Sequence, residues 1–239
     1  MKGSLVAIVT PMLANGEIDF NSFKKLLSFH ENEETNGIVL VGTTGESATL
    51  NKHERGEIFS FAKGESNLPL IAGVGSSSTN DAIDLIEIAQ KSGINDCLAV
   101  TPYYNKPSQK GLFLHFNELS KTSANIILYN VPGRTGVDLC PSTTEELSDI
   151  PNITGIKEAV DSSKRFEALK KIKSQRKDFL LYSGDDPTFV EFMRYGGDGV
   201  ISVAANVMPK QIRKLSDLCF EARFDEADQL NNNYLDFFK

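Results

Sequence analysis

Short runs of apolar residues, many of them β-branched, recur along the whole chain. Within each run the apolar residues are continuous and do not alternate with polar ones, which is typical of parallel strands covered on both faces. The pattern therefore predicts buried strands at residues 5–9, 38–41, 70–74, 97–100, 126–129, 153–156, 179–182 and 200–203.

Stretches with apolar residues at helical spacing separate the predicted strands. The clearest apolar stripes are Phe20/Phe23/Leu26/Leu27/His30, Ala82/Ile83/Ile86/Ala89, Phe189/Val190/Met193 and Ile212/Leu215/Leu218/Cys219. Gly93 follows the second stripe as a helix stop. Residues 143–146 have the composition of a capping box, and Asp186 before Pro187 has that of an N-cap followed by a first-turn proline. These signals predict strands and helices in alternation.

The predicted strand–helix units follow one another without a linker, a change of composition or a long polar segment. This order favours an α/β fold, a (β/α)8 TIM barrel over residues 1–223, with a doubly wound parallel sheet as the alternative. Residues 224–239 form a helical pattern without a capping signal at its end. We interpret them as the start of a truncated C-terminal helical region.

Composition and charge narrow the classes of function. The 239 residues include 25 Lys and Arg against 32 Asp and Glu, a formal charge of −7. This balance disfavours a nucleic acid as partner, because phosphate binding requires a basic surface. No apolar stretch approaches the roughly 18 residues needed to span a membrane. Cys97, Cys140 and Cys219 lie far apart, which indicates neither a disulfide framework nor a zinc finger, so we expect a cytoplasmic protein.

Polar residues at the ends of the predicted strands are the candidates for chemistry, because the loops that follow strands form the active sites of such barrels. Lys157 ends an apolar strand, where burial would lower its pKa and leave an amine that can attack a carbonyl. A lysine that points outward or pairs with Glu158 is the alternative. Tyr129 could transfer protons if hydrogen-bonded hydroxyls lower its pKa from about 10, or it could be a core residue. Arg134 could bind a carboxylate through its planar fork or lie on the surface.

Two further strand ends carry candidate residues. GTTGES at residues 42–47 combines a tight turn with a helix start whose free N–H groups suit an anion, although many ordinary turns share this composition. TPYYN at residues 101–105 places two aromatic residues in a proline-bounded loop, which suits a ligand, a subunit contact or ordinary loop packing. His30, His53 and His115 lie apart on predicted helices, so we interpret them as non-catalytic.

Taken together, these segments resemble the dihydrodipicolinate synthase (4-hydroxy-tetrahydrodipicolinate synthase) family of pyruvate-dependent class I lyases. The matching segments are VAIVTP at 6–11, GTTGES at 42–47, TPYYN at 101–105, LYNVPGRTG at 128–136, GIKEA at 155–159, SGDD at 183–186 and GVISV at 199–203. They fall in order at most of the predicted strands, so the resemblance covers the whole chain. Family members carry further helices after the barrel, which implies that the C-terminal helical extension is missing here.

The resemblance implies that pyruvate condenses with L-aspartate 4-semialdehyde, in lysine and diaminopimelate biosynthesis, without a metal or an organic cofactor. Lys157 would form the imine with pyruvate. Tyr129 would donate and accept protons, with Thr43 and Tyr104 as a relay. Tyr104 would reach in from a neighbouring subunit of a homotetramer, a dimer of dimers.

The resemblance also implies a set of binding contacts. Thr44 and the backbone at Ile201 would hold the pyruvate moiety, and Gly184 is a further substrate-binding position. Arg134 would bind the carboxylate of the semialdehyde.

Two alternatives remain on the same barrel. They are another pyruvate-dependent lyase, such as N-acetylneuraminate lyase, and a non-catalytic ligand-sensing paralogue. Arg134 within VPGRTG and Tyr104 within PYYN favour the synthase over the first, and the intact lysine, tyrosine and threonine set argues against the second. We also expect weak or absent feedback inhibition by lysine. Lys52 and Arg55 stand where lysine-sensitive relatives carry histidines, and these cations would repel a cationic effector.

Overall fold

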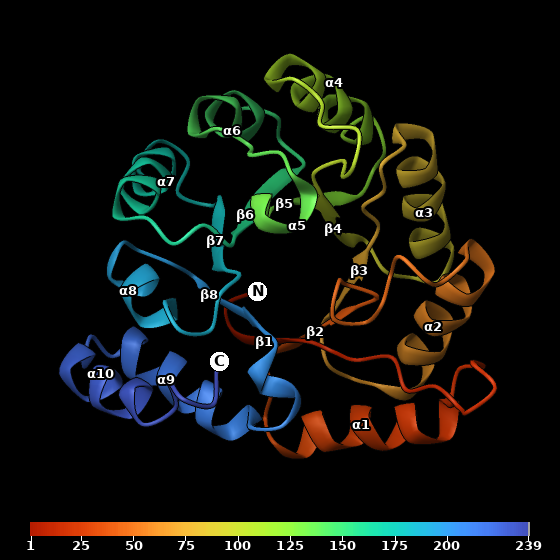
Figure 1. The fold of residues 1–239 in the computed structure, drawn as a ribbon, viewed down its shortest axis with the longest axis horizontal. Helices are drawn as coiled ribbons and strands as arrows, with labels where there is room; N and C mark the ends of the chain where they lie inside the picture. The colour runs from red at the N-terminus through yellow and green to blue at the C-terminus, as the bar shows by residue number, and fades with distance from the viewer. Residues whose placement is uncertain (239) are drawn as a thin grey trace.

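Parallel strands close into a barrel in the order β1 to β8, and helices surround it on the outside (Figure 1). The computed structural model describes residues 1–238. The strands are β1 Gly3–Ala7, β2 Gly37–Leu40, β3 Leu70–Gly73, β4 Asp96–Val100, β5 Asn125–Asn130, β6 Ile153–Glu158, β7 Leu180–Ser183 and β8 Gly199–Ser202. Almost all strand residues are buried, which explains their continuous apolar sequence. The predicted (β/α)8 barrel is confirmed, and the doubly wound alternative is wrong.

Each predicted apolar run overlaps one observed strand, with bounds that differ by at most two residues. The shift at β1 has a structural reason, because Gly3 pairs with Gly199 of β8 where the barrel closes. A Cβ atom on Gly199 would lie 2.1 Å from the carbonyl oxygen of Gly3, a distance that no other residue could accommodate. Glycine at this position therefore permits closure of the barrel.

Helices follow the strands as the apolar spacing predicts. They are α1 Phe20–Asn32, α2 Lys52–Glu65, α3 Thr79–Lys91, α4 Gln109–Leu119, α5 Pro132–Thr135, α6 Pro141–Ser148, α7 Ser163–Gln175, α8 Phe189–Arg194, α9 Pro209–Phe220 and α10 Phe224–Asn232, with a 3-10 turn η1 at Ala204–Asn206. The four predicted stripes lie on α1, α3, α8 and α9. Gly93 follows α3 with a φ of 80°, as expected for a helix stop.

Two predicted helix starts are wrong. The capping box at 143–146 lies inside α6, because Pro141 occupies the first turn and already begins the helix. The N-cap position of α8 is Thr188, not Asp186. The Asp186 carboxylate instead accepts hydrogen bonds from the backbone N–H groups of Val203 and Ala204, both at 3.0 Å. A contact between two distant loops therefore replaces the expected local cap.

The core has two layers. A larger cluster fills the space between the strands and the surrounding helices. A smaller cluster fills the barrel interior and includes Leu5, Val39, Leu98, Tyr129, Tyr182 and Ile201. At the N-terminal end of the strands, the hydroxyl of Tyr182 donates a 2.6 Å hydrogen bond to the carbonyl oxygen of Met1. The barrel interior is thus a packed core at this end.

Helix α10 packs against α8 and α9 beside the barrel. The helical pattern expected for 224–239 ends as a helix at Asn232, and residues 233–238 form turns. Lys239 of that expectation lies outside the described residues. Within residues 1–238, no helix combines the length and apolar character needed to cross a bilayer.

Candidate active site

A cavity of about 650 Å³ opens at the C-terminal ends of the strands, the end where barrel enzymes carry their active sites. Its wall contains side chains or backbone from Ala7, Val39, Gly42, Thr43, Thr44, Leu98, Tyr129, Val131, Gly133, Arg134, Lys157, Ala159, Gly184, Asp185, Asp186, Pro187, Val203 and Phe238. The barrel therefore brings together six of the eight site residues predicted from the sequence.

Lys157 lies at the end of β6 and is directly paired with Tyr129 of β5. Its side chain is only 4% exposed, and its Nζ lies 4.4 Å from the centre of the Tyr129 ring. Burial lowers the pKa of Lys157 to about 8; the Asp186 carboxylate opposes this change and Arg134 adds to it. The alternative in which the lysine points outward is therefore wrong. A larger share of neutral amine, the nucleophilic form, is present near neutral pH than for an exposed lysine.

Tyr129 is buried in the wall of the cavity. Burial raises the pKa of its phenol, while hydrogen bonding with the Thr43 side chain and the charge of Arg134 oppose the rise. The hydrogen bond with the Thr43 hydroxyl lowers the pKa of Tyr129, as the sequence predicted, but burial raises this pKa by more. The phenol is therefore protonated at neutral pH, in the form that can donate a proton.

The turn after β2 positions Thr43 and Thr44 in the cavity wall. It begins at Val41, a buried β-branched residue with a φ of 51°, a conformation that such residues rarely adopt. Gly73 of β3 packs against this point: a Cβ atom there would lie 2.1 Å from the Val41 carbonyl oxygen. Strained backbone held by close packing is common at functional sites.

The segment after β7 approaches Lys157 closely. The N–H of Gly184 donates a 2.7 Å hydrogen bond to the carbonyl oxygen of Glu158. A Cβ atom on Gly184 would lie 3.0 Å from Cε of Lys157, so glycine leaves room for the lysine side chain. Next to it, Oδ2 of Asp186 accepts the two loop N–H groups described above, and Oδ1 is buried without a hydrogen-bond partner.

Asp186 and Phe238 were not predicted from the sequence as site residues, but both lie in the cavity wall. The acidic pair at the end of an apolar strand was a usable signal for Asp186. The local pattern around Phe238 indicated only a helix, so its place in the wall depends on the tertiary fold.

The remaining predicted residues occupy distinct positions. Arg134 lies on α5, directly after β5, and contributes to the cavity wall. Ile201 is buried in β8 within the barrel interior, and Val203, two residues further along the chain, lines the cavity. Tyr104 is 93% exposed, has a φ of 76° and does not contribute to the cavity of its own chain.

The histidines lie away from the cavity, as expected. Nδ1 of His30 lies 3.0 Å from the Thr35 hydroxyl, and Nδ1 of His115 lies 2.9 Å from the Thr79 hydroxyl. Burial lowers the pKa of both histidines to about 4, so both are neutral near pH 7. Among residues 1–238, no group of three or more His, Cys, Asp or Glu side chains is arranged to hold a metal ion.

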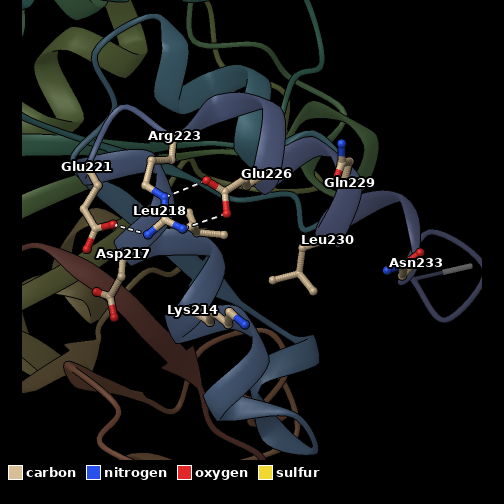
Figure 2. Close-up of a pocket in the computed structure, with 9 residues that line it drawn as sticks. All are labelled: Lys214, Asp217, Leu218, Glu221, Arg223, Glu226, Gln229, Leu230 and Asn233. Carbon is tan, nitrogen blue, oxygen red and sulfur yellow. Dashed lines mark hydrogen bonds and ion pairs between the residues drawn. The ribbon is translucent and has the colours of Figure 1, made fainter.

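A second cavity, of about 380 Å³, lies between α9 and α10 (Figure 2). Three of its charged side chains are paired with one another: Arg223 donates hydrogen bonds of 2.8 Å to Glu221 and of 2.7 and 2.6 Å to Glu226. None of the eight predicted site residues lines it. The cavity at the barrel mouth is therefore the candidate active site.

Comparison with known proteins agrees with this geometry. A model of the dihydrodipicolinate synthetase family matches residues 1–239. The 4-hydroxy-tetrahydrodipicolinate synthase of Stutzerimonas stutzeri is 52% identical over 230 residues, which cover 95% of this chain and 77% of that protein. The 4-hydroxy-tetrahydrodipicolinate synthase of Buchnera aphidicola subsp. Schizaphis graminum is 47% identical over 237 residues, which cover 98% of this chain and 80% of that protein.

A solved structure has the same fold over nearly the whole chain. The crystal structure of the chloride-inhibited dihydrodipicolinate synthase from Acinetobacter baumannii, complexed with pyruvate, matches with a TM-score of 0.95 and 43% sequence identity. The match covers 99% of this chain and 82% of that one. The resemblance inferred from the strand-end motifs is confirmed: the chain belongs to the dihydrodipicolinate synthetase family.

Proposed function

We propose that this chain condenses pyruvate with L-aspartate 4-semialdehyde through an imine on Lys157. The overall activity is that of a 4-hydroxy-tetrahydrodipicolinate synthase, a lyase of lysine and diaminopimelate biosynthesis, the name that the relatives at 47% and 52% identity carry. These relatives favour the synthase over an N-acetylneuraminate lyase or a sensing paralogue. The single observation that carries the mechanism is the buried amine of Lys157 against the Tyr129 ring.

The first half of the reaction uses the lysine amine. Nζ of Lys157 attacks the ketone carbon of pyruvate, and the carbinolamine loses water to give the imine. The imine draws electrons from the methyl group, which loses a proton and leaves an enamine. The pyruvate complex of the Acinetobacter baumannii relative supports pyruvate as the first substrate.

The second half forms the carbon–carbon bond. The enamine carbon attacks the aldehyde carbon of the semialdehyde, whose oxygen takes up a proton and becomes a hydroxyl. The amino group of the semialdehyde then attacks the imine carbon, closes the ring and releases the amine of Lys157. Each step moves protons between groups of the same cavity.

Tyr129 and Thr43 are suited to this proton transfer. The phenol lies beside the Lys157 amine and hydrogen bonds with the Thr43 side chain. A protonated tyrosine can donate to the leaving hydroxyl of the carbinolamine and recover a proton from the enamine-forming step. We assign Thr43 as its relay.

The walls of the cavity suggest how the two substrates are held. We assign Thr44, Gly184 and the backbone at Ile201 to the pyruvate moiety. Arg134 faces the same cavity with a planar fork that matches the carboxylate of the semialdehyde.

We infer a homotetramer, a dimer of dimers, in which Tyr104 completes the site of a neighbouring subunit. The support is its position: an almost fully exposed tyrosine held in an unusual backbone conformation at the barrel mouth. Tyr104→Phe protein mixed with Lys157→Ala protein should regain activity, because a hybrid pair contains one site with both wild-type groups. Verified hybrids without recovery would contradict the shared site.

We further infer a cytoplasmic location, which three cysteines without a disulfide support.

Trapping with borohydride tests the imine. Reduction should attach pyruvate to Lys157 as a stable secondary amine, which peptide mass spectrometry can locate. Lys157→Ala should abolish the adduct. Lys173→Ala is the matched control, because that amine is also partly buried but pairs with Asp198 at the other end of the barrel. An adduct on another lysine in wild-type protein would refute the assignment.

A further inference from the structure

We propose that Asn130, Glu158, Asp138 and Arg165 form a positioning network that holds Arg134 at a fixed place relative to Lys157. The inference rests on the function proposed above, in which these two residues act on different substrates. None of the four network residues lines the cavity. They lie behind it, between the barrel and its helices, and act through the residues that do.

Strand alternation places the network directly behind the reacting pair. Tyr129 pairs with Lys157, and the next residues, Asn130 and Glu158, pair with each other in the same register. Successive residues of a strand point to opposite faces. The first pair therefore faces the cavity while the second lies against the helices, and the two pairs share one piece of backbone.

Both the nitrogen and the oxygen of the Asn130 side-chain amide form hydrogen bonds. Its Nδ2 donates to Oδ1 of Asp138 at 2.8 Å and to the Glu158 carboxylate at 3.0 and 3.1 Å. Its Oδ1 accepts the N–H of Leu139 at 2.9 Å. Asn130 thus joins the two ends of the segment 131–137, which carries Arg134. That segment is a compact unit with its own internal hydrogen bonds, so fixing its ends fixes its orientation.

Arg165 of α7 completes the network. Its guanidinium donates to the Asp138 carboxylate and, at 2.7 Å, to the carbonyl oxygen of Leu139, and its Nε lies 3.7 Å from Oε2 of Glu158. Glu158 is 2% exposed and also accepts the N–H of Val160 at 2.8 Å. Asn130, Glu158 and Arg165 are buried while Asp138 is half-buried, so removing one partner leaves buried polar groups unpaired, which is costly. The buried groups therefore tie the Arg134 segment to the end of β6.

Arg134 depends on the network more than Lys157 does. Lys157 sits in a strand that pairs with β5 on one side and with β7 on the other. The segment 131–137 has no strand neighbour, and its base is held by Asn130, Arg165 and a hydrogen bond of 2.7 Å from Gln109 to the Asp138 carbonyl oxygen. Loss of the network should therefore disturb binding of the second substrate and spare imine formation.

Asn152 provides a matched control at the opposite end of the same two strands. Its Nδ2 donates to the carbonyl oxygens of Ser120, Thr122 and Ala124, at 2.9, 3.1 and 2.9 Å. It anchors the loop before β5 and does not line the cavity at the other end of these strands. Asn130→Ala and Asn152→Ala each remove an asparagine with several hydrogen bonds, so both should lower the thermal midpoint.

The test compares these two variants. Asn130→Ala should raise KM for the semialdehyde roughly 10- to 100-fold, the scale of a small misplacement of a positioned group, while borohydride trapping of pyruvate changes only a few-fold. Asn152→Ala should leave both quantities near wild type. Arg165→Lys, which keeps the charge but loses the fork to Asp138 and Leu139, should raise the same KM by a smaller factor.

The outcomes separate this inference from the proposed function. If both asparagine variants lose stability alike and keep wild-type KM values, the network is merely structural and the inference is wrong. Unchanged KM in Arg165→Lys would overturn it as well, even if Asn130→Ala does not fold. Failure of wild-type protein to trap pyruvate on Lys157 would instead refute the proposed function.

Discussion

The two ends of the barrel both bury charge, but they compensate it differently. At the N-terminal end, the Asp198 carboxylate is 2% exposed and contacts two lysine amines, Lys173 and, at 2.7 Å, Lys2. It also accepts the N–H of Leu181 at 3.0 Å. At the C-terminal end, the Lys157 amine lies over a tyrosine ring, and the Asp186 carboxylate is bound to backbone N–H groups.

The difference separates stability from reactivity. A carboxylate surrounded by donors is held in one place, which suits a structural role. An amine buried with incomplete compensation keeps a lowered pKa and remains a nucleophile. Changes at the barrel mouth should therefore alter catalysis more than stability, and changes at the base should do the reverse.

Arg134→Ala should give the largest catalytic loss among changes that leave Lys157 in place. A charged hydrogen-bonding partner of the semialdehyde carboxylate is lost, which should cost about 2–4 kcal/mol in transition-state binding. Single-turnover trapping of pyruvate should remain close to wild type, because that step precedes binding of the second substrate. Equal losses in trapping and in steady-state condensation would remove Arg134 from its proposed role.

Asp198→Ala should lower the stability of the protein more than its catalytic activity. Two lysine amines lose their shared carboxylate, one of them partly buried, and the free energy of unfolding should fall by about 3 kcal/mol. Denaturant unfolding measures this loss, and kcat per folded molecule should stay within a few-fold of wild type at low temperature. A variant of normal stability with strongly reduced kcat would break the contrast between the two ends.

The pH dependence of pyruvate trapping tests the lowered pKa of Lys157 at the barrel mouth. Since the pKa of Lys157 is lowered to about 8, the neutral amine increases as pH rises toward that value. Trapping with cyanoborohydride should accelerate about tenfold per pH unit below the pKa and level off above it. Asp186→Asn should shift the rise of the trapping rate to lower pH, because the Asp186 carboxylate raises the pKa of Lys157. If the trapping rate rose with pH only above pH 10, or if Asp186→Asn did not shift this rise, the lowered pKa of Lys157 would be contradicted.

Inhibition of the condensation by added L-lysine should be the smallest of these effects. Nζ of Lys52 lies 2.5 Å from the Asp81 carboxylate and 2.7 Å from that of Asp84, and Arg55 donates to backbone carbonyls at Ser47 and Leu50. The two carboxylates beside Lys52, which could otherwise attract a cationic effector, are thus already paired with this lysine. Condensation measured against rising L-lysine should change little, and saturable inhibition at sub-millimolar concentration would contradict this expectation.

The sequence alone predicted a parallel sheet covered by helices, because continuous apolar runs separated by amphipathic helices are typical of strands buried on both faces. The unbroken series of strand–helix units then favoured a closed barrel over a doubly wound sheet. It also placed Lys157, Tyr129 and Arg134 at strand ends, since the end of an apolar run is a local property. Helix starts were harder: Asp186 has the local pattern of a cap, but a stronger pair of distant backbone donors occupies its carboxylate.

Only the tertiary structure decided which strand ends face each other and which polar groups meet behind them. The register that sets Lys157 against Tyr129, and Glu158 against Asn130, joins residues 28 positions apart. The partners of Asp138 and Arg165 are likewise set by how α7 packs on the barrel. Such pairs leave no periodic trace in a sequence, because a buried polar group needs a partner in space and any chain position that the fold brings near can supply it.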